Sequence, residues 1–189
     1  MIYKHIVVLA SSAGGLKALS QVLSSLPPDF PAPIVLVQHL SPHHPSMLAQ
    51  ILSRRCPMIV KEAQTGDKLE PGTVYIAPPD QHLLINLDGT LSLSHTQKVR
   101  FVRPAADVLF KSAAISFQEG VIAVVLTGKD GDGAAGVQAV KEMGGTVIAQ
   151  DRASSEFFSM PDAAIRTGVV DYILPLDAIA ATLLNLVSK

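Results

Sequence analysis

The sequence predicts an α/β protein, with a doubly wound, mostly parallel sheet, helices on both faces and a small antiparallel hairpin region. Continuous apolar runs at residues 6–10, 34–37 and 121–126 are typical of strands buried on both faces. Segments of helical periodicity alternate with these runs, which indicates parallel strands joined by crossover helices. With 189 residues, 48% of them hydrophobic, the chain can form a single domain over residues 1–189 with a substantial core.

Two helices are expected in the first third of the chain. Apolar residues recur at helical spacing from Leu16 to Leu23, and Pro27-Pro28 ends that helix. A second helical pattern begins at Met47, and Ser46 just before it is a candidate cap. Both helices follow apolar strands, so each is expected to cross over to the next parallel strand.

The middle of the chain has a different pattern. Short apolar runs at 59–63, 73–77 and 83–87 are separated by turns, and Asp88-Gly89 is a strong hairpin signal. We interpret residues 59–95 as an antiparallel patch within the α/β chain.

The alternation resumes in the last third. A helix is expected from Arg103 to about Gln118, with Pro104 near its first turn and Arg103 paired with Asp107 one turn later. The strand at 121–126 leads into a glycine-rich loop at 127–133. Two further strands are expected at 146–149 and 169–174. Three further helices are expected: one at 134–143, a short one that begins at Met160, and one at 177–187.

Charge and cysteine content narrow the function classes. The 15 basic and 16 acidic side chains nearly cancel and form no long run, so no strong field favours nucleic acid or an anionic membrane. The single cysteine, Cys56, rules out an internal disulfide framework and fits a reducing compartment. The apolar runs are far shorter than the roughly 20 residues of a membrane span, and the N-terminus leads straight into a strand. We therefore expect a cytoplasmic protein with no membrane insertion.

Reactive side chains follow three of the predicted strands. Ser11 and Ser12 follow the first strand, His39 follows the second, and Asp130 and Asp132 follow the strand at 121–126. Ligands of open α/β sheets bind beyond the carboxyl ends of the strands, so these loops should share one edge. A serine, a histidine and an aspartate can serve as nucleophile, general base and orienting carboxylate.

Five blocks of the sequence together resemble the catalytic domain of CheB, the chemotaxis protein-glutamate methylesterase. They occur in family order, and the resemblance runs from about residue 5 to the C-terminus. It implies a Ser-His-Asp triad on a doubly wound sheet, hydrolysis of glutamyl methyl esters on methyl-accepting chemotaxis receptors, deamidation of certain receptor glutamines, and no metal or organic cofactor. The blocks are residues 10–15, 37–39, 74–78, 103–110 and 126–136.

Carried over position by position, the resemblance makes Ser12 the nucleophile, His39 the base and Asp132 the orienter. Ala13 stands where the family usually has threonine, and Lys129-Asp130-Gly131 replaces the usual Met-Gly-Asn. Family members typically carry an N-terminal receiver domain that is not in this sequence, so a separate phosphorylatable regulator is expected. The expected oxyanion and near-site residues are Ala13, Gly14, Gly128 and Lys129.

Three alternatives remain open. A metallohydrolase could use His39, His43 and His44 with Asp130 and Asp132, although their spacing is not that of a regular ligand set. A phosphate-binding module could use the first strand-to-helix turn, although neither G-x-G-x-x-G nor a Walker lysine is present. The third alternative is a domain that binds receptor tails or a partner without turnover, because Lys129 and Asp130 alter the loop at the expected oxyanion site.

Overall fold

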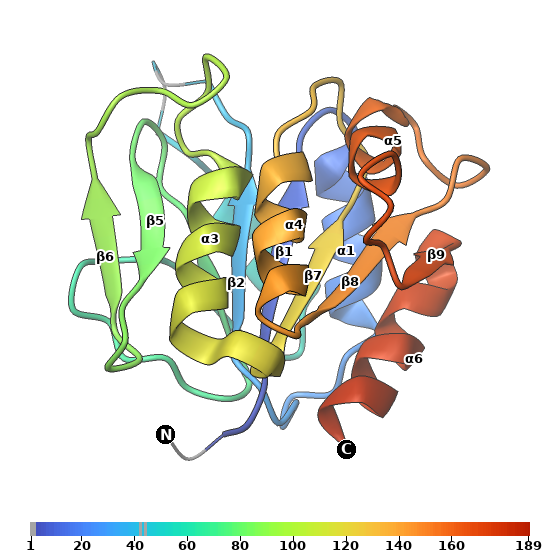
Figure 1. Cartoon of the computed structure of the whole chain (residues 1–189). Coiled ribbons are helices and arrows are strands. Elements are labelled where there is room, and N and C mark those ends of the chain that lie inside the picture. The colour runs from blue at the N-terminus through green and yellow to red at the C-terminus, as the bar shows by residue number, and fades with distance from the viewer. Residues whose placement is uncertain (1–2, 42, 44) are drawn as a thin grey trace.

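The computed structural model describes residues 3–41, 43 and 45–189 (Figure 1). Seven parallel strands form one sheet in the order β3-β4-β2-β1-β7-β8-β9, and β5 and β6 form a separate antiparallel hairpin. The strands are β1 Ile6–Ser11, β2 Ile34–Gln38, β3 Ile59–Glu62, β4 Thr73–Ile76, β5 His82–Ile85, β6 Leu91–Ser94, β7 Val121–Val125, β8 Thr146–Gln150 and β9 Tyr172–Leu174.

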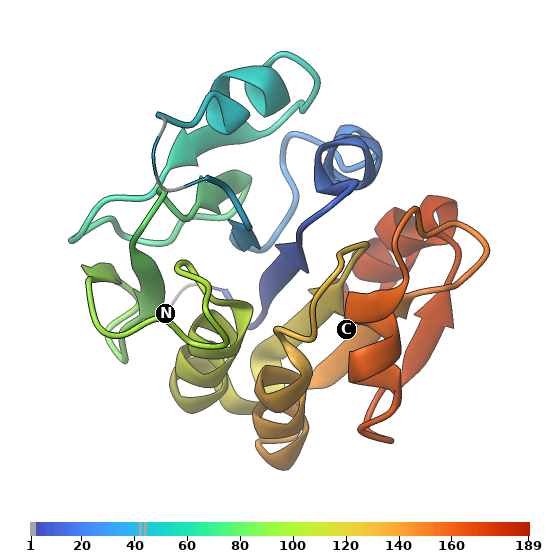
Figure 2. The same ribbon diagram turned by 90° about the horizontal axis from the view of Figure 1, so that it is seen from above.

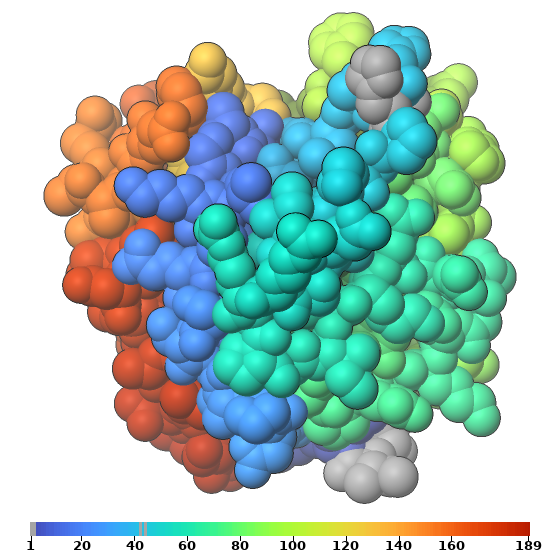
Figure 3. All heavy atoms as spheres, turned by 180° about the vertical axis from the view of Figure 1, so that it is seen from behind, coloured from blue at the N-terminus to red at the C-terminus, as the bar shows by residue number. Residues whose placement is uncertain are grey.

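Two layers of helices cover the sheet, as predicted. Helices α1, α2 and α6 share one core with one face of the sheet, while α3, α4, α5 and the hairpin share a second core with the other face. Figure 2 looks along the strands, with β1 between the two layers, and Figure 3 shows the face on which α1 lies. The helices are α1 Gly15–Ser24, α2 Leu48–Ser53, α3 Ala106–Phe117, α4 Ala134–Glu142, α5 Ser159–Ile165 and α6 Leu176–Val187.

Strand β1 is the central strand and the topological switch point of the sheet. It pairs with β2 on one side and with β7 on the other, so the chain continues outward from it in both directions. All six residues of β1 are buried, as are all five of β2 and all five of β7. Continuous burial explains why these segments read as unbroken apolar runs.

The interpretation of residues 59–95 as one antiparallel patch is wrong for its first half. Strands β3 and β4 pair parallel with each other, and β4 pairs parallel with β2 in the main sheet. Only β5 and β6, joined across Asp88-Gly89, are antiparallel. All four residues of β4 are buried, so this strand belongs inside a sheet covered on both faces.

The remaining boundaries are close to those predicted. The strand expected at 169–174 is shorter and spans Tyr172–Leu174, at the edge of the sheet. The Ser46 Oγ accepts a hydrogen bond from the Leu48 N–H (3.1 Å), but the N-cap position of α2 is occupied by Met47 and not by Ser46. Among the helices that the structure describes, none is long and apolar enough to cross a membrane.

Candidate active site

The loops that carry Ser12, His39 and Asp132 lie side by side at the carboxyl edge of the sheet. Ser11 and Gln38 are register partners in the β1–β2 pair, so the next residues, Ser12 and His39, leave the sheet from neighbouring positions. Strand β7 borders β1 on the other side and leads into the loop that holds Asp132. The topology therefore brings together three residues that are far apart in the sequence.

The backbone around Ser12 is held by hydrogen bonds within its own turn and to Thr127. The Ser12 N–H donates to the Thr127 carbonyl (3.0 Å), and the Ser12 carbonyl accepts from the Gly15 N–H (2.8 Å). The Thr127 hydroxyl donates to the Ala13 carbonyl (2.9 Å). The turn between β1 and α1 is thus tied to the end of β7, which limits where the Ser12 side chain can lie.

Gln38 is a positioning residue whose role the sequence analysis missed. Its side chain is buried, and its amide Nε2 donates to the carbonyls of Ser12 (2.8 Å) and His39 (3.1 Å). Its Oε1 accepts from the Ser11 hydroxyl at 2.6 Å. A Cβ at Gly15 would lie 1.9 Å from this oxygen, so only glycine fits there. The sequence does contain a signal for this role: a glutamine at the end of a buried strand, whose buried amide needs hydrogen-bond partners.

The buried Asp132 carboxylate connects His39 to the start of α3. Its Oδ2 lies 2.8 Å from the Nε2 of His39. The same carboxylate accepts hydrogen bonds from the N–H groups of Ala106 (2.5 Å) and Asp107 (3.0 Å). These donors are otherwise unpaired in a first helical turn, where the helix dipole also favours negative charge. Asp132 is therefore held in a fixed orientation toward the imidazole.

Asp107 makes the reciprocal contact with α4. Its Oδ1 accepts from the N–H groups of Gly133 (3.0 Å) and Gly136 (2.7 Å) at the start of α4. A Cβ at Gly136 would lie 2.6 Å from the Cβ of Phe110, so glycine allows α3 and α4 to pack this closely. Asp132, just before α4, binds the start of α3, and Asp107 on α3 binds the start of α4.

The expected pair between Arg103 and Asp107 is not formed. Arg103 instead donates to Asp80 through Nε (3.1 Å) and Nη2 (2.8 Å). The basic group nearest to Asp107 is Arg100, at 3.7 Å. Arg103 lies before the start of α3 and is bonded to Asp80, while Asp107 is turned toward α4, so the two side chains do not meet.

Asp130 contacts the other nitrogen of the His39 ring. Its Oδ2 lies 2.9 Å from Nδ1 as an ion pair, and its Oδ1 accepts from the Asp132 N–H at 2.9 Å. The contact with Nδ1 lacks the direction of a hydrogen bond, because Nδ1 has no hydrogen-bond partner among the described residues. Nδ1 is consequently not hydrogen-bonded to Ser12. The contact between His39 and Asp132 is therefore formed, while the one between Ser12 and His39 is not.

The two carboxylates change the acidity of His39. Burial lowers the pKa of the imidazole, but its contacts with Asp130 and Asp132 and their negative charges outweigh this effect and raise the pKa to about 9. Burial also raises the pKa of Asp130, but the contact with His39 outweighs it, so that pKa is lowered. The resting site at neutral pH is thus an imidazolium between two carboxylates.

This arrangement makes the stability of the fold depend on pH. The pKa of His39 is about 9 in the folded state, against about 6.5 for an unperturbed histidine. The stabilisation is therefore complete below about pH 6.5 and is lost as the pH rises through about 9. Because Asp130 is partly exposed, we expect the free energy of unfolding to fall by about 1–3 kcal/mol over this range. Urea denaturation at pH 6, 7.5 and 9 measures this fall, which should be smaller in His39→Gln than in the wild type. Equal falls in the two proteins would contradict His39 as the source of the pH dependence.

The loop after β7 offers fewer oxyanion donors than expected. The Gly128 N–H donates to the Phe157 carbonyl (2.9 Å), so in this conformation it is not free to bind an oxyanion. The Lys129 ammonium lies 4.3 Å from the centre of the Phe157 ring, on that side of the loop. Within the described residues, the N–H groups of Ala13, Gly14 and Lys129 have no backbone acceptor. These three groups remain available as donors.

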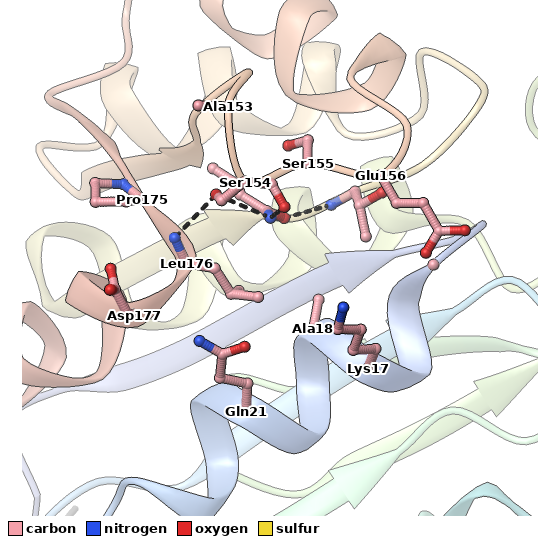
Figure 4. A pocket seen from close by; sticks show the side chains of 13 residues that line it. Lys17, Ala18, Gln21, Ala153, Ser154, Ser155, Glu156, Pro175, Leu176 and Asp177 are labelled. Carbon is pink, nitrogen blue, oxygen red and sulfur yellow. Dashed lines mark hydrogen bonds between the residues drawn. The ribbon is translucent and has the colours of Figure 1, made fainter.

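Two cavities adjoin the loops of the site. A small one of about 90 Å³ opens beside His39, with Leu40, Phe101, Val102 and Pro104 on its walls and Lys98 and Arg103 at its edge. A larger one of about 510 Å³ lies between α1, the loop at 153–156 and the start of α6, and shares Gly14 and Thr127 with the Ser12 turn (Figure 4). The labelled side chains around it include Lys17, Glu156 and Asp177. Only the small cavity touches His39.

The structure gives no support to the metal-site alternative. Over residues 3–41, 43 and 45–189, no group of three or more His, Cys, Asp or Glu side chains could hold a metal ion. His43 is exposed, and His44 lies outside the described residues.

The fold and the site define a doubly wound α/β protein with serine, histidine and aspartate at the switch point of its sheet. The model of the family described as CheB methylesterase matches residues 7–183, and the chain belongs to this family. The solved catalytic domain of the CheB methylesterase of Thermotoga maritima is 41% identical, with a TM-score of 0.94, covering 98% of this chain and all of that one. The resemblance seen in the sequence and the predicted fold class are both confirmed.

Curated relatives show the same family. A putative protein-glutamate methylesterase/protein-glutamine glutaminase of Leptospira interrogans is 41% identical over 95% of this chain and 93% of its own length. The protein-glutamate methylesterase/protein-glutamine glutaminase of Thermotoga maritima is 42% identical, and the protein-glutamate methylesterase FrzG of Myxococcus xanthus is 43% identical. The chain spans 54% of the length of each of these two relatives.

Proposed function

We propose that this protein hydrolyses the methyl esters of glutamyl side chains and, in the same site, the amides of glutamine side chains. The carrying observation is the 2.8 Å contact between His39 and a buried, anchored Asp132, beside the Ser12 turn, in a member of the CheB methylesterase family. The names of its relatives, which pair methylesterase with glutaminase, support both substrates. A base held by a carboxylate is what a weakly acidic serine hydroxyl needs to become a nucleophile.

The proposed reaction uses these three side chains. His39, held through Nε2 by Asp132, takes the Ser12 proton on Nδ1 as Oγ bonds to the ester carbonyl carbon. The carbonyl π pair moves onto oxygen, then re-forms the carbonyl as the bond to methoxide breaks, and His39 returns the proton to give methanol. Water then attacks the acyl-serine by the same route, which yields the glutamate and restores Ser12.

The surroundings of the three residues suggest how the substrate is held. The unpaired N–H groups of Ala13, Gly14 and Lys129 are the proposed donors to the oxyanion. The small apolar cavity beside His39 is the proposed entry for the ester side chain. Phe101 on its rim is 95% exposed, and a large exposed aromatic is a common anchor for a protein partner.

We further propose methylated chemotaxis receptors, or similar methylated signalling proteins, as the substrates. Family membership supports the receptor class. The near-zero net charge argues against nucleic acid as a partner. The single cysteine and a receptor substrate fit an activity in the cytoplasm.

Replacing Ser12 with alanine tests the proposal directly. Because the nucleophile is lost, we expect methanol release from a methylated receptor fragment to fall at least about a thousandfold. Ser24→Ala, an exposed serine on α1, is the matched control and should keep wild-type activity. Methanol release by Ser12→Ala at the wild-type rate would refute Ser12 as the nucleophile.

A second candidate, a domain that binds receptors without turnover, is favoured by one observation. Asp130 occupies the space beside Nδ1, the nitrogen that would accept the Ser12 proton. A serine-reactive phosphonate separates the two functions, since an enzyme forms a covalent adduct that Ser12→Ala does not. No labelling of the wild-type protein up to pH 10 would favour the binding domain.

A further inference from the structure

The two carboxylates that contact His39 differ in how firmly they are held. Asp132 is fully buried and anchored by two backbone N–H groups at the start of α3. The Asp130 side chain is 34% exposed, and its Oδ2 meets Nδ1 of His39 without a directed hydrogen bond. Asp130 accepts from one backbone N–H, that of Asp132 (2.9 Å), whereas Asp132 accepts from two in a fully buried place, so Asp130 is the less firmly held of the two carboxylates.

The contacts of the ring determine where its protons are. A neutral imidazole has one N–H, so one of its two nitrogens would face a carboxylate oxygen lone pair to lone pair. Carboxylate oxygens 2.8 and 2.9 Å from the two nitrogens place negative charge beside both, which favours a proton on each. An imidazolium has no lone pair with which to take a proton from Ser12. The geometry seen here is therefore that of a resting site.

We propose that Asp130 is a positioning residue that holds His39 in this resting, doubly protonated form and that must leave Nδ1 before the ester can be cleaved. This proposal rests on the proposed function, since it assigns Nδ1 to the proton of Ser12. When Asp130 moves away, Nδ1 loses its proton to solvent and faces the serine. Asp130 thus sets the pH above which the site can work.

The other charged groups around the ring do not perform this role. Arg100 lies near Asp130 and Asp107 and partly offsets their charge. Lys98 and Arg103 lie at the edge of the cavity beside His39, and Arg103 is already paired with Asp80. The charged and titratable groups that face the ring or its two carboxylates are Asp130, Asp132, Asp107, Arg100, Lys98 and Arg103.

The decisive variant is Asp130→Asn, which keeps the shape and can still accept from the Asp132 N–H through its oxygen. We expect kcat/KM on a methylated receptor fragment at pH 7 to rise about tenfold, with the acidic limb of the pH profile at least about one unit lower. Asp29→Asn makes the same change of charge at an exposed position and should follow the wild type. A lower kcat/KM at every pH with an unmoved acidic limb would overturn the proposal, because Asp130 would then assist the reaction.

A measurement without turnover separates this proposal from the proposed function. NMR titration of the His39 ring, identified by its absence in His39→Gln, should have its midpoint at least about one unit lower in Asp130→Asn than in the wild type. Equal midpoints would overturn the hold of Asp130 on His39. If the wild type and Asp130→Asn were both inactive at every pH while the midpoint still fell, the hold would stand and the proposed esterase function would fail.

Discussion

Replacing Asp132 with asparagine is expected to lower kcat by about 10³–10⁴-fold with little change in the fold. The asparagine oxygen can still accept from the Asp107 N–H, which turns its NH₂ group toward Nε2 of His39 and leaves the Ala106 N–H without its acceptor. Nε2 must then be unprotonated, so the proton lies on Nδ1, where Asp130 stabilises it. The ring is trapped in the tautomer that cannot take the Ser12 proton. Methanol release under saturating substrate measures this effect.

The matched control for Asp132→Asn is Asp171→Asn. Asp171 is also a hydrogen-bonded carboxylate, paired with Lys141 and with the Val147 N–H far from the candidate site. Circular dichroism should show both variants folded, with activity lost only in Asp132→Asn. A kcat within tenfold of the wild type would show that His39 is not oriented by this carboxylate.

Replacing Asp107 with alanine is expected to lower the free energy of unfolding by about 2–4 kcal/mol. The substitution removes the acceptor for two N–H groups at the buried start of α4, those of Gly133 and Gly136. Unpaired buried donors cost more than a lost surface contact, because water does not replace the acceptor. Urea denaturation of the variant and the wild type measures the difference.

Asp177→Ala is the control for this experiment. Asp177 also lies in the first turn of a helix, α6, but it is exposed and makes no capping hydrogen bond there. Its replacement should change stability by less than about 0.5 kcal/mol. If Asp107→Ala and Asp177→Ala lowered the free energy of unfolding equally, the hydrogen bonds from the start of α4 to Asp107 would add no specific stability.

Much of the fold could be read from the sequence, because strands buried on both faces must be apolar throughout. The runs that became β1, β2 and β7 were all identified, with residues 6–10, 34–37 and 121–126 close to the observed ranges. The parallel direction of β3 and β4 could not be predicted, since short apolar runs between turns look alike in parallel and antiparallel strands. Pairing direction depends on which neighbour each strand meets.

The roles of Asp107 and Gln38 also required the structure. Arg103 and Asp107 have the spacing of a helical pair, yet Asp107 bonds across to α4 and Arg103 to Asp80. Gln38 appeared in a recognised block without a role, while the structure shows its side chain joining the Ser12 and His39 loops. Local spacing cannot reveal partners that lie 20 or more residues away.

The sequence by itself determined the α/β class, the family and the placing of Ser12, His39 and Asp132 at one sheet edge. The placing follows from local pattern, because a loop that follows a buried parallel strand must emerge at the carboxyl end of the sheet. Only the tertiary structure decided that His39 lies between two carboxylates and that Asp130 faces Nδ1, the nitrogen that we propose takes the Ser12 proton. The contacts of a side chain depend on how neighbouring loops pack, and that packing is set by the whole chain.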